Sequence, residues 1–289
     1  MKYNKKYSFV GCKKGNVEKI NIVGLPFDGT ETFRKGTAKG PDYIRKYSDS
    51  IETFSYFQKK DITELPVSDT GNLIFKNKSP ENIINEIQKE TQFYIDNKKI
   101  PLFIGGEHLV TFPVVKAYAN FYKKLNVLYF DAHADFRDNY NGNKLSHAAV
   151  ARRIFEMISE KNLFMFGIRS FEKNEYDYMK LKNIFFDTEF KNFETVINKI
   201  KNFPVYVTID MDVFDPSCMQ GVGNPEAGGI DFNFFMNKII TGLDKLNNIL
   251  AIDVVEYAPP YDHSGASGIF TAKIIRELLF VLNKNVQKR

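Results

Sequence analysis

The stretch that decides the fold reads Val127-Leu128-Tyr129-Phe130-Asp131-Ala132-His133-Ala134-Asp135. A short apolar run leads here directly into Asp, His and Asp at two-residue spacing. Because successive side chains of an extended chain point to opposite faces, Asp131, His133 and Asp135 are expected on one face. In open parallel sheets, ligands bind beyond the carboxyl ends of the strands. The stretch therefore predicts a buried strand with a polar site at its end.

A second strand of the same kind reads Val205-Tyr206-Val207-Thr208-Ile209-Asp210-Met211-Asp212. Asp210 and Asp212 again share a face at the end of a run that should be buried. Unpaired carboxylates there would be costly to desolvate, so a positive partner is required. Neither strand offers a lysine or arginine nearby in sequence. A metal explains both clusters better than separate turn or cap roles for each aspartate.

Other apolar runs of strand length recur along the chain, each followed by a stretch with helical periodicity. They are nearly continuous rather than alternating, as expected of parallel strands covered on both faces. The full set of predicted strands covers residues 18–27, 100–104, 126–130, 162–168, 183–186, 204–213 and 248–255. Ser79 followed by Pro80 indicates the start of one helix. Further helices are predicted at residues 147–158, 192–202, 231–246 and 265–282. The alternation predicts a single three-layer α/β/α domain over residues 1–289 with a mostly parallel central sheet.

Composition limits the classes of protein that remain. With 289 residues, 43% hydrophobic and 26% charged, the chain has the proportions of an ordinary globular protein. Its net charge of +5 comes from scattered basic residues, which argues against a nucleic-acid partner. No stretch approaches the ~18 uncharged apolar residues of a membrane span, and no apolar segment follows the charged N-terminus. The two cysteines, Cys12 and Cys218, make no disulfide framework, so a cytoplasmic location is expected.

The four histidines sharpen the metal prediction. His108, His133 and His147 fall at junctions between strands, loops and helices, whereas His263 is expected to be a surface side chain. Oxygen-rich sites with a few imidazoles suit Mn²⁺ and similar divalent ions, and the lack of thiolates argues against structural zinc. Four carboxylates carry a charge of −4, which two divalent ions balance; they are Asp131, Asp135, Asp210 and Asp212.

Four long irregular stretches are candidates for functional loops. They span residues 28–40, 134–146, 215–229 and 258–265. Loops of that length inside a compact domain are often functional. Since the last three each follow a predicted strand, we expect the site among them.

Three short motifs, in this order, resemble the signatures of the ureohydrolases, the family of arginase, agmatinase and relatives. They are Gly105-Gly106-Glu107-His108, Asp131-Ala132-His133-Ala134-Asp135 and Ile209-Asp210-Met211-Asp212-Val213-Phe214-Asp215-Pro216. Gly24-Leu25-Pro26-Phe27-Asp28 and the stretch 253–262 are similar to the agmatinase subgroup, so the resemblance covers nearly the whole chain. Residues 68–72 depart from that pattern, with Asn72 where a second Asp is usual, and no role in the site is expected of them.

The resemblance implies a role for each matching residue. The first Mn²⁺ would be held by His108, Asp131, Asp135 and Asp210, and the second by Asp131, His133, Asp210 and Asp212. A hydroxide between the two ions would attack the guanidinium carbon of a substrate. Asp135 would accept the proton and deliver it to the leaving amine, His147 would shuttle protons, and Glu256 would hold the guanidinium group.

The implied activity is that of a binuclear manganese amidinohydrolase, a hydrolase acting on linear amidines. Hydrolysis of agmatine to urea and putrescine, a polyamine, fits best, because the loop 138–147 resembles the agmatinase version. Asp138 and Glu226 are expected near the site, where they would repel a carboxylate, although Lys144 could oppose them.

The alternative substrates are arginine, guanidinobutyrate, formiminoglutamate and guanidine. The alternative classes of protein are a single-zinc deacetylase-like enzyme and a non-catalytic binding protein. The resemblance also implies a homo-oligomer, a trimer or hexamer.

Overall fold

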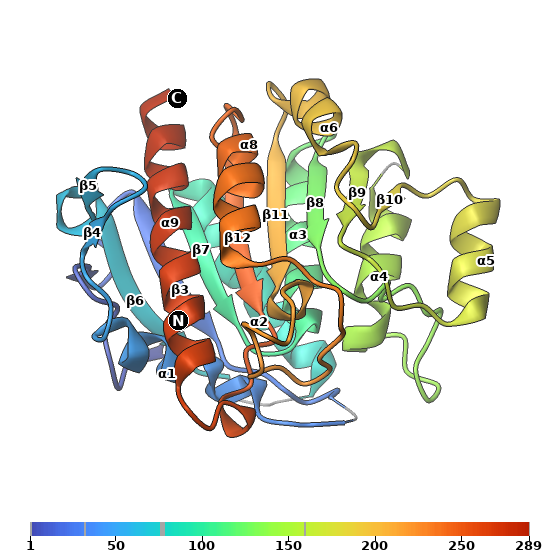
Figure 1. Cartoon of the computed structure of the whole chain (residues 1–289), viewed down its shortest axis with the longest axis horizontal. Coiled ribbons are helices and arrows are strands. Elements are labelled where there is room, and N and C mark those ends of the chain that lie inside the picture. Colours follow the sequence, from blue (N-terminus) through green and yellow to red (C-terminus); the bar gives the residue numbers. More distant parts are fainter. Residues whose placement is uncertain (1, 32, 76–78, 159, 289) are drawn as a thin grey trace.

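A twisted sheet of ten strands forms the middle layer of the molecule (Figure 1). The structure is a computed structural model, and it describes residues 2–31, 33–75, 79–158 and 160–288. Nine strands follow the order β1-β6-β3-β7-β12-β11-β8-β9-β10, and β2 pairs with β6. Their bounds are β1 Tyr3–Asn4, β2 Lys13–Lys14, β3 Ile20–Leu25, β6 Val67–Leu73, β7 Ile100–Gly105, β8 Asn126–Phe130, β9 Leu163–Phe166, β10 Phe186–Asp187, β11 Val205–Asp210 and β12 Ile249–Val255.

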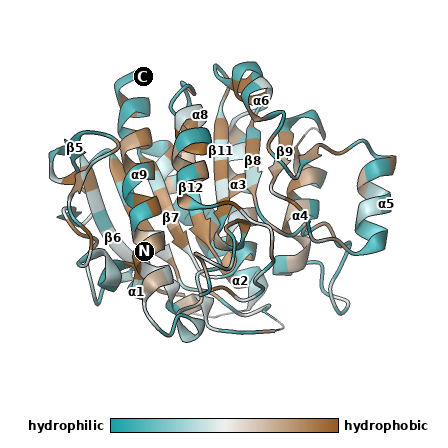
Figure 2. Ribbon diagram, in the orientation of Figure 1, coloured by the Kyte–Doolittle hydropathy of each residue, from teal (hydrophilic) through white to brown (hydrophobic). Residues whose placement is uncertain are grey.

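The sheet is parallel except at one edge, where β1 runs antiparallel to β6. A separate antiparallel pair consists of β4 (Phe54–Ser55) and β5 (Lys60–Asp61). Strands β3, β7, β8, β11 and β12 are buried along their whole length. Figure 2 shows them as a brown, apolar centre between helices whose outer sides are polar. The prediction of a mostly parallel sheet is confirmed.

Helices cover both faces of the sheet and enclose two apolar clusters, one on each side. One face carries α1 (Gly40–Ser48), α6 (Phe193–Ile200), α7 (Phe232–Phe234), α8 (Thr241–Leu243) and α9 (Ala266–Lys288), with a π-helical segment at Phe235–Ile240. The other face carries α2 (Pro80–Asp96), α3 (Thr111–Phe121) and α4 (Val150–Met157), while α5 (Lys173–Leu181) lies beyond the β10 edge (Figure 1). This is the three-layer α/β/α arrangement that was predicted. No described helix is both long enough and apolar enough to cross a membrane.

Several predicted boundaries were wrong. The run at 183–186 forms only the two-residue strand β10, and helix α9 extends to Lys288, beyond residue 282. Helices α1, α3 and α5 were not predicted. Short elements and frayed ends depend on tertiary contacts more than on local pattern, which explains most of these differences.

Strand β6 is the largest omission, since no strand was predicted at residues 67–73. Its sequence is mostly polar, yet every residue of the strand is buried. Two of its polar side chains are held by Arg45 of α1, whose Nε lies 2.9 Å from Asp69 Oδ2 and whose Nη1 donates to Asn72 Oδ1 at 2.5 Å. A polar strand is stable in the interior here because a buried arginine reaches it from another element.

Candidate metal centre

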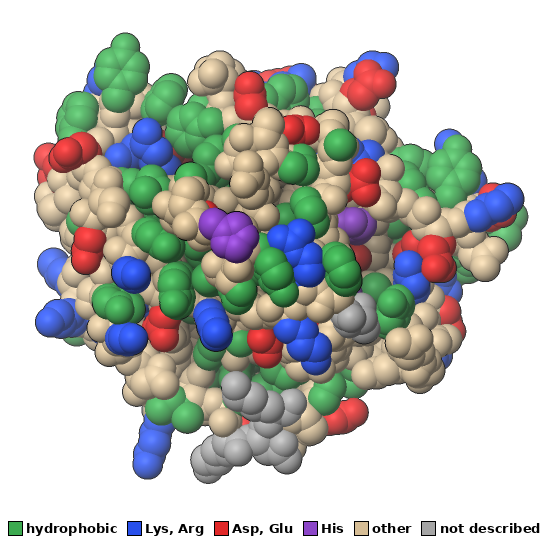
Figure 3. Space-filling view, turned by 60° about the horizontal axis from the view of Figure 1, so that its bottom comes forward, with side chains coloured by type: hydrophobic (Ala, Val, Ile, Leu, Met, Phe, Trp, Pro, Cys, Tyr) green, Lys and Arg blue, Asp and Glu red, His purple; other side chains and the backbone are tan. Residues whose placement is uncertain are grey.

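The strand order brings the predicted ligands to one edge of the sheet. Strand β12 lies between β7 and β11, and β11 pairs with β8. His108 begins a 3-10 turn just after β7, Asp131 follows β8, Asp210 ends β11 and Glu256 follows β12. Because these strands are parallel, their carboxyl ends meet at the lower edge of Figure 1. Figure 3 brings that edge forward and shows one histidine side chain recessed below the surrounding surface.

One imidazole nitrogen faces three carboxylates. Nδ1 of His108 lies 3.0 Å from Asp131 Oδ2, 3.1 Å from Asp210 Oδ2 and 3.4 Å from Asp135 Oδ2. The other ring nitrogen, Nε2, lies 2.9 Å from Thr208 Oγ1. If Nε2–H donates to this hydroxyl, Nδ1 presents its lone pair to the carboxylates. A lone pair among three carboxylate oxygens is the donor set of a cation.

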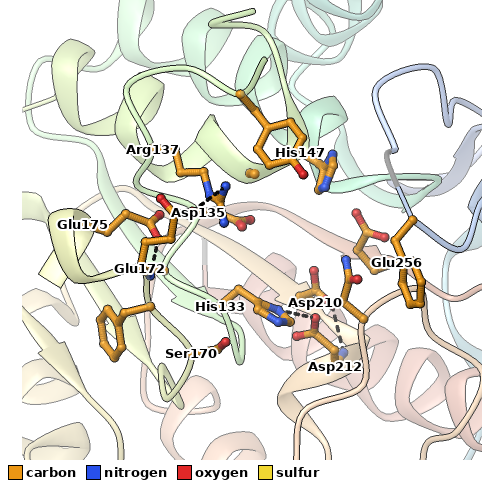
Figure 4. A pocket seen from close by; sticks show the side chains of 16 residues that line it. His133, Asp135, Arg137, His147, Ser170, Glu172, Glu175, Asp210, Asp212 and Glu256 are labelled. Carbon is orange, nitrogen blue, oxygen red and sulfur yellow. Dashed lines mark hydrogen bonds and ion pairs between the residues drawn. The ribbon is translucent and has the colours of Figure 1, made fainter. Parts of the chain in front are cut away.

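A second set of ligand atoms shares Asp131. Nδ1 of His133 lies 2.8 Å from Asp212 Oδ2 (Figure 4). The same nitrogen lies 3.8 Å from Asp131 Oδ1. The other oxygen of Asp131, Oδ2, is buried and accepts no hydrogen bond in the described part of the chain. Leaving a charged oxygen buried in this way is costly without a cation. Within each set, the possible ligand atoms lie within 4.8 Å of one another, so the residues fit a metal centre. The two sets are His108, Asp131 and Asp135, and Asp131, His133 and Asp212.

The electrostatics of the cluster point the same way. Burial, followed by repulsion from Asp212 and Asp210, raises the pKa of Asp131 well above its usual value. Burial and the charge of Asp212 raise the pKa of Asp210 to about 8. Burial would also raise the pKa of Asp212, but His133 outweighs it and lowers that pKa to about 2. Carboxylates packed this closely cannot all ionise at neutral pH unless a cation joins them.

A cavity of about 340 Å³ opens over the cluster. Asp210 and Asp212 lie at its base beside His133, and Glu256 and His147 lie across from them (Figure 4). One carboxylate oxygen of Glu256 accepts the backbone N–H of His108 at 2.6 Å, which fixes the side chain toward the centre. Glu256 holds a left-handed backbone conformation (φ 67°), a strained geometry that is frequent at functional sites.

The structure brings together the predicted metal ligands and the predicted catalytic residues. The six predicted ligands lie in the two sets or contact them; they are His108, Asp131, His133, Asp135, Asp210 and Asp212. Asp135, His147 and Glu256, the predicted catalytic residues, line the cavity. His263 is exposed, as expected.

The acidic side chains in the cavity lining are not the two that were expected near the site. Asp138 is exposed, and the charge of nearby Lys144 lowers the pKa of its carboxyl group. Neither Asp138 nor Glu226 lines the cavity, whereas Glu172 and Glu175 do. Both of these glutamates lie at the start of α5, a helix that was not predicted.

The first long loop also belongs to the site, contrary to expectation. Residues 28–40 begin shortly after the end of β3 at Leu25, and Phe33 from this loop lines the cavity. Nδ1 of His147 lies 3.0 Å from the carbonyl oxygen of Thr30 in the same loop. The predicted strand at 18–27 ends where this loop begins, so the rule that site loops follow strands would have included this loop as well.

Two supporting residues of His108 were missed. Tyr129 stacks on the His108 ring at 4.7 Å, and its hydroxyl donates to Asp135 Oδ2 at 2.9 Å. The hydroxyl oxygen of Thr208 lies 2.9 Å from His108 Nε2. Each lies two residues before an aspartate of the cluster, Asp131 or Asp210, so the two-residue periodicity of a strand would have placed both on the same face.

Comparisons with known proteins agree with this geometry. The family model described as "Arginase family" matches residues 18–281. The chain is 35% identical to an agmatinase of Bacillus cereus, covering 90% of this chain and 91% of that one. It is 34% identical to an N(1)-aminopropylagmatine ureohydrolase of Thermococcus kodakarensis, with 82% of each covered. A crystal structure from Clostridium difficile, provisionally named an agmatinase, superposes with a TM-score of 0.89 at 35% identity and covers 93% of this chain and 98% of that one.

Proposed function

The chain belongs to the arginase family of ureohydrolases, which act on guanidino compounds, and from this membership we propose that it hydrolyses agmatine to putrescine and urea. The observation that carries the proposal is the convergence of three carboxylates on Nδ1 of His108, across a cavity from Glu256. A second group of possible ligands, Asp131, His133 and Asp212, supports a two-metal centre over a single-zinc site.

We further propose two Mn²⁺ ions per chain as the cofactors. His108, Asp131, Asp135 and Asp210 would hold one ion, and Asp131, His133, Asp210 and Asp212 the other. When bound, such ions supply the positive charge that lowers the pKa of a water molecule at the centre. Mn²⁺ suits this mixture of carboxylate oxygens and imidazole nitrogens better than Mg²⁺ does.

The side chains of the protein supply the remaining steps. The carboxylate of Glu256 accepts hydrogen bonds from the guanidinium group and holds its carbon over the centre. As the water oxygen bonds to that carbon, Asp135 accepts the proton and then delivers it to the amine nitrogen as the C–N bond breaks. The second proton of the water leaves the oxygen that becomes the urea carbonyl, and His147, half-buried at the cavity wall, passes that proton to solvent. Burial lowers the pKa of His147, which keeps the imidazole neutral and able to accept a proton at neutral pH.

The charge of the cavity supports agmatine, which carries a guanidinium group and a terminal ammonium. Glu172, Glu175 and Glu256 lie in the lining outside the proposed ligand set. Among the described lining residues, Arg137 is the one with a permanent positive charge. Its Nη1 lies 2.9 Å from Glu172 Oε1, so this charge is already paired. A cationic tail is therefore favoured, and the α-carboxylate of arginine is disfavoured.

Urea release from a panel of guanidino compounds tests the proposal. After chelation the protein should be inactive, and Mn²⁺ should restore activity better than Mg²⁺. At equal low concentrations, agmatine should exceed arginine by roughly a hundredfold or more in kcat/KM, because a like charge at the cavity mouth costs several kcal/mol. Activity in the chelated protein would contradict the metal centre, and equal rates on arginine would contradict the substrate assignment.

Cytoplasmic location and assembly into a trimer or hexamer stay predictions. The free state of Cys12 and Cys218 agrees with a reducing compartment. The mass of the purified protein in solution would test the assembly.

A further inference from the structure

Glu107 is a buried carboxylate that has no part in the proposed centre. It follows two glycines and precedes His108, but its side chain turns toward the loop after β3. Its Oε1 accepts the hydroxyl of Thr30 at 2.5 Å, and its Oε2 accepts the backbone N–H of Thr30 at 2.8 Å. Both carboxylate oxygens are therefore used to hold one residue of that loop.

The backbone around Glu107 holds the same loop. The N–H of Glu107 donates to Phe27 O at 2.8 Å, and the N–H of Gly106 donates to Leu25 O at 2.9 Å. The approach is so close that a Cβ on Gly106 would lie 1.9 Å from Phe27 O, so only glycine fits there. The loop that begins after β3 is thus fastened to the end of β7 by side-chain and backbone contacts together.

Thr30 also contacts His147, which is 117 residues away in sequence, and so links the fastened loop to that histidine. The backbone N–H of His147 donates to Thr30 Oγ1 at 3.1 Å. Nδ1 of His147 lies 3.0 Å from the carbonyl oxygen of Thr30. A carbonyl can only accept a hydrogen bond, so Nδ1 must carry the hydrogen when the ring is neutral, and Nε2 is left with its lone pair.

We propose that Glu107 and Thr30 are positioning residues for His147. Glu107 fixes the loop, and Thr30 fixes the place and the tautomer of the imidazole, so that Nε2 is the nitrogen available for proton exchange. The inference rests on the proposed function in one respect, namely that His147 moves protons during turnover. The tautomer itself can be measured without turnover, which separates the two proposals.

The first experiment reads the tautomer by NMR of the metal-free full chain labelled with [¹⁵N]histidine. The chain has four histidines, so the His147 signal is identified by its loss in His147→Asn. The native chain should show the Nδ1–H form. Thr30→Val keeps the size of the side chain and the backbone carbonyl but removes the hydroxyl that contacts Glu107 and the backbone N–H of His147. Without these two contacts the carbonyl of residue 30 should no longer be held against Nδ1, so the variant should show a mixture with the Nε2–H form. An unchanged tautomer in Thr30→Val would overturn the proposal.

A matched control comes from the same loop. The hydroxyl of Thr37 donates to the carboxylate of Glu31, so Thr37→Val removes a buried hydroxyl–carboxylate bond of the same kind without touching His147. The control should leave the His147 signal unchanged. Thr30→Ser, which keeps the hydroxyl, should retain the native tautomer and provides the comparison if Thr30→Val folds poorly.

The second experiment is a double-mutant cycle on urea release. Thr30→Val should lower kcat by roughly 10- to 100-fold with little change in KM, within the range lost when a proton-transfer group is misplaced. In the His147→Asn background the same change should cost less than about twofold, because its target is already absent. Equal losses in both backgrounds would show that Thr30 acts on the fold rather than through His147. If the native chain releases no urea from any guanidino compound, the proposed function is wrong. The NMR experiment still tests the tautomer of His147, because it does not depend on turnover.

Discussion

At the scale of single residues, Asp131 is the one on which the whole centre depends. Its two oxygens face the two ligand sets, and burial raises its pKa well above the usual value. Asp131→Asn keeps the shape of the side chain but cannot ionise, so it removes the cost of burying an acid whose ionised form is disfavoured in the metal-free chain. We expect the metal-free variant to be at least as stable as the native chain, while the stabilisation by Mn²⁺ is largely lost. Thermal unfolding with and without Mn²⁺ measures both; the native chain should gain about 2.7 kcal/mol for each ion bound at 100 times its dissociation constant.

His147 is the matched comparison, because it lines the cavity without belonging to either ligand set. His147→Asn should keep the stabilisation by Mn²⁺ and lose roughly 10²–10⁴-fold in turnover, the range for a lost proton-transfer group. If His147→Asn lost its Mn²⁺ response, or Asp131→Asn kept it, the division between ligands and proton carriers would be wrong.

At the scale of elements, strand β6 depends on helix α1. Arg45 and Asp69 are both fully buried and paired at 2.9 Å, and Asn72 also accepts from Arg45. Arg45→Met would leave the Asp69 charge buried without its cation. We expect the free energy of unfolding to fall by about 3–5 kcal/mol, measured by denaturant titration.

An exposed ion pair serves as the control for this prediction. Lys173 and Asp177 pair on the surface of α5, where solvent screens the charges. Lys173→Met should change stability by less than about 0.5 kcal/mol. A loss at Arg45 as small as the loss at Lys173 would mean that β6 does not need the buried pair.

At the scale of the whole molecule, we propose that residues 1–289 form one domain, because β12 from the C-terminal part lies in the middle of the sheet between β7 and β11. A fragment of residues 1–248 would lack that strand, so β7 and β11 would each lose the partner on one side and keep only β3 and β8, respectively. We expect the fragment to show no cooperative thermal transition, whereas the full chain does. A cooperative transition in the fragment would indicate an N-terminal domain that folds alone.

Local periodicity was sufficient to predict much of this protein. The two-residue spacing of Asp131, His133 and Asp135 and the continuous apolar runs before them follow from the geometry of a single buried strand. The same reasoning placed the start of α2 at Pro80, where the Ser79 side chain accepts from the N–H of Asn82. These features need only a few neighbouring residues, so they can be read along the chain.

What the tertiary structure alone decided is which distant segments meet. The polar strand β6 has no apolar pattern to reveal it, and it is stable because Arg45 arrives from α1. The acidic side chains over the cavity come from Glu172 and Glu175 rather than Asp138 and Glu226, and Thr30 reaches His147 across 117 residues. Strand order and loop packing are set by the burial of the whole sheet between two layers of helices. No local pattern encodes them, because their free energy comes from contacts between segments far apart in the sequence.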